Sequence, residues 1–168
     1  TFLFNSTYFT HQPLIPVFAE KVLDVGPTAL GALASAGGLG ALTGLVFIAS
    51  RRHIERKSTY YYGGTLTALA FLFVFAVSNT YLVAFAALLL AGAGVAGFSS
   101  MQSTLVLLAT PDAVRGRVLG ILNIIIGVTP LGLLMVGAVA EFLGPGAAVR
   151  GVAAGGIVLT VLWVGAAK

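Results

Sequence analysis

The sequence predicts an all-α integral membrane protein of six transmembrane helices, and three observations lead to that prediction. Of the 168 residues, 58% are hydrophobic and 8% are charged, with a mean hydropathy of +1.04, whereas about 25% of residues are charged in a soluble domain. Stretches 25–50 and 58–111 contain no Asp, Glu, Lys or Arg, and about 20 apolar residues span the hydrocarbon core. These runs are continuously apolar, unlike barrel strands that alternate over about ten residues.

Six apolar runs give the predicted spans, and short turns join them. The spans cover residues 1–19, 27–50, 58–77, 81–108, 117–140 and 148–167. Pro27 suits the first turn of a helix, and Gly144-Pro145-Gly146 separates the last two spans. Because such short links make consecutive helices antiparallel neighbours, we expect residues 1–168 to form one six-helix bundle without a separate soluble domain.

The first span combines proline interruptions with polar side chains. Pro13 and Pro16 break its helix, and Asn5, Tyr8 and Gln12 recur at intervals of three and four residues, so they are expected to share one face. Broken helices beside polar residues mark substrate sites in transporters. Hydrogen bonding between neighbouring helices is the competing interpretation. His11 is a candidate proton site, or a neutral hydrogen-bonded group near the membrane surface.

Later spans carry further polar residues. The fourth span contains Gln102 and the fifth contains Asn123. Buried polar groups need partners or a watered cavity within a membrane. We therefore expect these two residues, with the polar face of the first span, to line a substrate cavity, and helix-to-helix hydrogen bonding remains the alternative.

The fifth span begins with a polar turn. We expect Thr110 to cap it, Pro111 to occupy its first position and Asp112 to lie at its positive end. Arg115 and Arg117 then lie at the membrane surface.

Lys and Arg counts predict the orientation in the membrane. Seven basic residues lie on one side, namely Arg51, Arg52, Arg56, Lys57, Arg115, Arg117 and Lys168. Only Lys21 and Arg150 lie on the other. The side richer in basic residues is expected to be cytoplasmic, which places both ends of the chain in the cytoplasm of a multi-pass protein of the cell membrane.

Several stretches resemble the major facilitator superfamily. They are the phrase PDAVRGRVLG at 111–120, the run GVTPLG at 127–132 with Gly137 and Glu141, and the opening LIPVFAE at 14–20. Within that superfamily the chain is similar to the drug and siderophore exporters that include the enterobactin exporter and macrolide efflux proteins. The resemblance covers nearly the whole chain. It implies helices seven to twelve of a twelve-helix secondary transporter, with an N-terminal six-helix half outside this sequence, and antiport-driven efflux of a small molecule.

The resemblance also suggests roles for two segments. Stretch 44–57 matches the family's basic loop and retains Arg51 and Arg52, which could act at a cytoplasmic gate together with Asp112, Arg115 and Arg117. It lacks an Asp ahead of the arginines, so simple anchoring at the cytoplasmic surface would explain it as well. The second segment resembles the antiporter glycine-proline motif. It implies a kinked fifth span packed on a neighbour through Gly127, Pro130, Gly132 and Gly137.

Other classes of function fit the sequence poorly. The chain has no cysteine, P-loop or HExxH motif, and Gly92-x-Gly94-x-x-Gly97 lies inside a long apolar run instead of after a strand. We therefore expect no enzyme activity, no metal, no cofactor and no nucleic-acid partner. The expected partners are a small-molecule substrate, the lipid bilayer and the N-terminal half. The alternative is a self-contained six-helix channel or membrane scaffold that acts as a homodimer.

Overall fold

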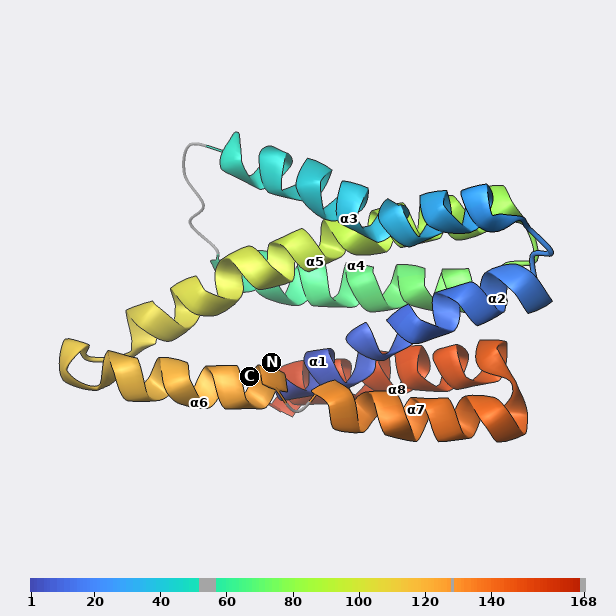
Figure 1. Ribbon diagram of the computed structural model, residues 1–168. Coiled ribbons are helices and arrows are strands. Elements are labelled where there is room, and N and C mark those ends of the chain that lie inside the picture. The colour runs from blue at the N-terminus through green and yellow to red at the C-terminus, as the bar shows by residue number, and fades with distance from the viewer. Residues whose placement is uncertain (52–56, 128, 167–168) are drawn as a thin grey trace.

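The computed structural model describes residues 1–51, 57–127 and 129–166, apart from the side chain of Leu131. Every regular element within these ranges is a helix (Figure 1). The predicted all-α class is therefore confirmed. Because each helix satisfies its own backbone hydrogen bonds, this is one of the two ways in which a chain can cross lipid.

The first span is divided into three short helices. These are α1 (Phe2–Thr7), the 3-10 helix η1 (Phe9–Leu14) and α2 (Ile15–Lys21). Pro13 lies inside η1 and Pro16 lies in the first turn of α2. Since proline has no N–H to donate, it removes an α-helical hydrogen bond. A turn follows α2, in which Asp24 has a φ of 49°.

Three long helices form one layer of the bundle (Figure 1). They are α3 (Pro27–Ala49), α4 (Lys57–Val77) and α5 (Tyr81–Ala109). In the described part of the chain, α3 and α4 each pack mainly on α5. Small residues allow this close approach: a Cβ atom on Gly40 would collide with the carbonyl of Leu89 in α5.

The remaining helices form the second layer (Figure 1). The 3-10 turn η2 (Asp112–Val114) leads into α6 (Arg115–Gly127), α7 (Thr129–Leu143) and α8 (Pro145–Ala166). Gly144 joins the last two helices with a φ of +85°, a conformation that L side chains rarely adopt. The predicted Gly144-Pro145-Gly146 turn therefore ends α7 sharply, and Pro145 begins α8.

Five stretches in the described ranges are long and apolar enough to cross a membrane. They are Pro27–Ala49, Lys57–Val77, Tyr81–Ala109, Asp112–Leu143 and Pro145–Ala166. The first predicted span is not among them, because it is divided into three helices that are each too short to cross a membrane. Side chains of Thr1, Phe2 and Trp163 border one hollow, so the start of the first span and the end of α8 lie at the same end of the bundle.

Aromatic side chains join the two layers at their core. The Phe18 ring of α2 lies 4.5 Å from the Phe75 ring of α4, centroid to centroid. Closer to the start of the chain, Phe4 of α1 and Phe98 of α5 lie 4.1 Å apart. All four side chains are buried. These contacts hold the broken first span against the long helices and so position its polar residues.

Candidate functional site

A groove of ≈ 460 Å³ lies where the broken first span faces α3 and α5. Its lining residues are Tyr8, Phe9, His11, Gln12 and Ile15 of the first span, Ala34, Gly37, Gly38 and Ala41 of α3, and Leu88, Gly92 and Val95 of α5. Polar side chains in this lining come only from the first span. The volume lies within the range of about 300–1,000 Å³ that is usual for small-molecule sites.

The local sequence explains why polar groups face this groove. Tyr8 ends α1, and its N–H donates to the carbonyl of Phe4 over 2.7 Å. The chain then tightens into η1, which contains Pro13. A 3-10 helix has three residues per turn and an α-helix has 3.6. The change of pitch therefore rotates the residues after Tyr8 relative to those of α1.

His11 is a buried polar residue of this groove. It is 5% exposed, and its Nδ1 pairs with the carbonyl oxygen of Tyr8. Because a carbonyl only accepts hydrogen bonds, Nδ1 carries a proton and donates it to this bond. The Tyr8 and His11 rings meet edge to face at 4.9 Å. These two contacts hold the imidazole in one orientation.

The other predicted cavity residues of the first span separate in the structure. Tyr8 and Gln12 both line the groove, and Gln12 is exposed. Asn5 is 4% exposed and does not line the groove. Its Nδ2 donates to the carbonyl of Thr1 over 3.1 Å. Asn5 is therefore separated from Tyr8 and Gln12, because its amide is bonded to Thr1 at the start of α1 and does not reach the groove. A cavity role for Asn5 stays a prediction.

Gln102 joins a polar cluster at the start of the first span. Its Nε2 donates to Thr1 Oγ1 over 3.1 Å, and the same oxygen lies 3.2 Å from the Tyr61 hydroxyl. This cluster links α1, α4 and α5. Sequence reasoning did not find Thr1 or Tyr61 as partners, because their separation from Gln102 along the chain leaves no periodic signal.

Asn123 has a different location from the other predicted cavity residues. It is exposed on α6 and is not part of the groove lining. Its role in a cavity wall therefore stays a prediction.

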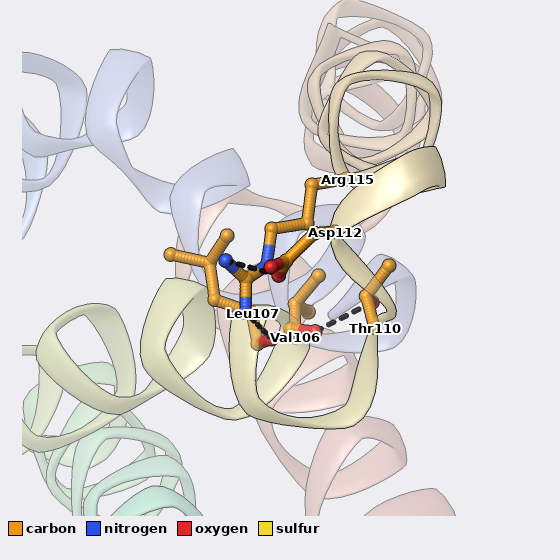
Figure 2. A network of polar contacts seen from close by, with 5 residues as sticks. All are labelled: Val106, Leu107, Thr110, Asp112 and Arg115. Carbon is orange, nitrogen blue, oxygen red and sulfur yellow. Dashed lines mark hydrogen bonds and ion pairs between the residues drawn. The ribbon is translucent and has the colours of Figure 1, made fainter.

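Figure 2 shows the turn between α5 and α6, which contains two of the predicted gate residues. Arg115 Nη1 lies 2.6 Å from Asp112 Oδ1, and Arg115 Nη2 makes a long 3.5 Å bond to the carbonyl of Leu107. The prediction that Thr110 caps the next helix is wrong. Its hydroxyl instead donates to the carbonyl of Val106 over 2.6 Å. Thr110 ends α5 in an extended conformation, so its side chain is turned back toward its own helix.

The remaining gate residues lie at the same membrane side as this turn in the predicted topology. Arg51 follows α3, and its guanidinium lies 4.6 Å from the centre of the Phe47 ring. Arg117 is exposed on α6. Arg52 lies outside the described residues. A gating role for these arginines stays a prediction.

The glycine-proline segment lies around the interruption between α6 and α7. Gly127 ends α6, and Pro130 is the second residue of α7. Gly132 packs closely on the first span, since a Cβ atom there would lie 2.9 Å from the Thr10 methyl group. Gly127 and Gly137 face open space, with no atom within 4 Å of such a Cβ. Of the three glycines, Gly132 alone makes a close approach.

The described residues contain no group of three or more His, Asp or Glu side chains that could hold a metal ion. Neither the curated proteins nor the solved structures gave a match. The family model of the Major Facilitator Superfamily matches residues 1–167, and the helices of the described residues fit one half of the family's twelve-helix fold. The match covers nearly the whole sequence, and the chain therefore belongs to the Major Facilitator Superfamily of secondary membrane transporters.

Proposed function

We propose that this chain forms one wall of the substrate pathway in an exporter of drug-like or siderophore-like small molecules. The observation that carries the proposal is the groove beside η1, where Tyr8, His11 and Gln12 face small residues of α3 and α5. Apolar walls with a few convergent polar groups are typical of small-molecule sites. Family membership supports transport in general, and the efflux direction rests on the resemblance of the motifs at 111–120 and 127–132.

We further propose that a second six-helix half covers this groove during alternating access. The two halves would rock about the site so that it opens to one side of the membrane at a time. Gln12 is exposed at the groove. Polar groups on a partner half would form hydrogen bonds with the Gln12 amide, which otherwise lies in an apolar environment. We also propose that export is coupled to proton antiport, because the segment at 127–132 resembles the antiporter glycine-proline motif.

Two matched glycine variants test the groove directly. A Cβ atom on Gly38 meets nothing within 4 Å, and Gly38 lines the groove. Gly38→Leu should therefore fill the groove without displacing backbone. Gly31→Leu is the control, because Gly31 lies in the same helix, faces equally open space and is not part of the groove lining.

The assay is accumulation of a panel of fluorescent drugs and iron-loaded siderophores in cells that express the full-length gene. We expect full-length protein to lower accumulation of at least one compound. Gly38→Leu and Gln12→Ala should abolish that effect at matched expression, and Gly31→Leu should retain it. Equal activity of Gly38→Leu and Gly31→Leu would show that the groove is not the pathway. Higher accumulation in cells with the protein would indicate uptake instead of efflux.

A proton-carrying role for His11 can be tested separately. Asparagine can place an N–H near the position of Nδ1 and so retain the bond to the Tyr8 carbonyl, but it does not titrate. If His11 carries the coupled proton, His11→Asn should bind substrate in proteoliposomes yet lose acceleration of export by an imposed pH gradient. Export by His11→Asn that still responds to the gradient would assign the proton to another residue.

A further inference from the structure

A second groove lies on the opposite side of α5 from the candidate site. It occupies ≈ 440 Å³ between α3 and α4, with α5 as its floor. On α5 it is bordered by Leu90, Ala93, Gly94 and Gly97, whereas the first groove is bordered by Leu88, Gly92 and Val95. At 3.6 residues per turn these two sets fall on opposite faces of the helix. The second groove is therefore separate from the proposed substrate path.

The shape of this groove follows from how its three helices pack. Gly44 of α3 packs on α5, since a Cβ atom there would lie 2.8 Å from the carbonyl oxygen of Ala93. Gly64 of α4 packs on the other flank, where a Cβ would lie 2.5 Å from the carbonyl oxygen of Gly94. Beyond these contacts α3 diverges from α4 and α5 toward its C-terminal end (Figure 1). The divergence leaves an elongated opening between α3 and α4.

The interior of the groove suits a hydrocarbon chain. Phe47, Ile48 and Leu90 border it together with Ala93 and several glycines, and its polar lining residues are Thr43, Thr59, Tyr60 and Thr67. The hydroxyl of Thr43 donates to the carbonyl of Gly40 in its own helix over 2.9 Å, so it needs no partner in the groove. Lining residues run from Thr59 to Thr67 along α4, a distance of about 12 Å at about 1.5 Å per residue.

The end of the groove carries positive charge. The Arg51 guanidinium lies over the Phe47 ring, which borders the groove. Arg51 is exposed and follows the last turn of α3. Lys57 begins α4 two residues before Thr59, another lining residue. A cation at the end of an apolar groove in a membrane is complementary to a lipid with an anionic headgroup.

We propose that the α3–α4 groove binds an anionic phospholipid, with an acyl chain between the helices and the headgroup phosphate on Arg51. This site is independent of the transported substrate and lies on the other side of α5. It gives the transporter a preference for membranes that contain anionic lipid at the face where Arg51 lies.

The test uses the full-length protein in bilayers with a fluorescent reporter inside the groove. Phe47→Trp retains an aromatic ring for Arg51 to cover, and Trp163→Phe removes the tryptophan present in the described chain. Quenching by brominated phosphatidylglycerol is compared with quenching by brominated phosphatidylcholine. We expect phosphatidylglycerol to be preferred about fivefold, which corresponds to about 1 kcal/mol for one basic residue near the membrane surface.

Two variants in the reporter background separate the chain and headgroup parts of the site. Gly63 borders the groove and has open space around its Cβ position, so Gly63→Leu should block the groove and reduce quenching by either lipid. Arg51→Gln should remove most of the preference for phosphatidylglycerol. Gly31→Leu and Arg117→Gln are the controls, since neither residue borders the groove. Equal quenching by both lipids, or a preference unchanged by Arg51→Gln, would overturn the proposal.

Discussion

Replacing Gly94 by alanine tests how closely α4 must approach α5. A Cβ atom on Gly94 would lie 2.6 Å from the backbone nitrogen of Ala68 and 2.7 Å from the carbonyl oxygen of Gly64. Ordinary contacts of this kind begin at 3.4 Å. Both neighbouring atoms belong to the backbone of α4, so no side-chain rotation can relieve the clash. The helices must therefore separate by about 0.8 Å, the difference between 2.6 Å and 3.4 Å.

The size of the effect follows from that separation. A radial gap of about 0.5–1 Å forfeits about a quarter to a half of the dispersion energy of each contact. The same crossing brings Gly97 of α5 against the carbonyl of Tyr60 in α4, so the contacts around it are at risk as well. Overpacking costs up to about 3 kcal/mol, and alanine recovers about 1 kcal/mol of helix propensity. We expect a net loss of about 2 kcal/mol in the free energy of unfolding.

The assay is reversible unfolding in mixed micelles with increasing sodium dodecyl sulfate, followed by far-UV circular dichroism. Gly151→Ala is the matched control, because Gly151 is inside α8 and a Cβ there meets nothing within 4 Å. The control should unfold at the wild-type detergent fraction or above it. A Gly94→Ala protein within about 0.5 kcal/mol of the control would refute close packing at this crossing.

Three further variants are expected to change stability by smaller amounts in the same unfolding assay. Gly144→Ala should lose about 1 kcal/mol, because φ is +85° at this turn; stability equal to that of Gly151→Ala would contradict the left-handed turn. Asp112→Asn should cost less than about 1 kcal/mol, since both side chains of its ion pair with Arg115 are exposed, and a loss above about 1 kcal/mol would be too large for such a pair. Gln102→Leu should cost about 0.6 kcal/mol, the typical value for a hydrogen bond between membrane helices, and unchanged stability would show that its bond to Thr1 contributes nothing.

The groove itself was only partly predictable from the sequence. Pro13 and Pro16 marked the broken span, and its polar residues were identified as candidates before their positions were known. The prediction treated the span as one continuous α-helical face, which placed Asn5 with Tyr8 and Gln12. In the structure, the Asn5 amide instead donates to the carbonyl of Thr1 at the start of α1, and Asn5 does not line the groove. A periodicity argument groups residues by the face of a helix, but the packing of neighbouring helices decides which of them reach a cavity.

The sequence by itself determined the all-α class and the positions of the five long apolar stretches. Long uncharged runs can be buried only in lipid, and short turns between them leave consecutive helices side by side. Tertiary structure alone decided which faces of α3, α4 and α5 meet and therefore where space remains. Glycines at Gly44 and Gly64 let two helices close on α5, and the divergence of α3 opens the groove near Arg51. Those contacts join residues far apart in the chain, and no local pattern specifies them.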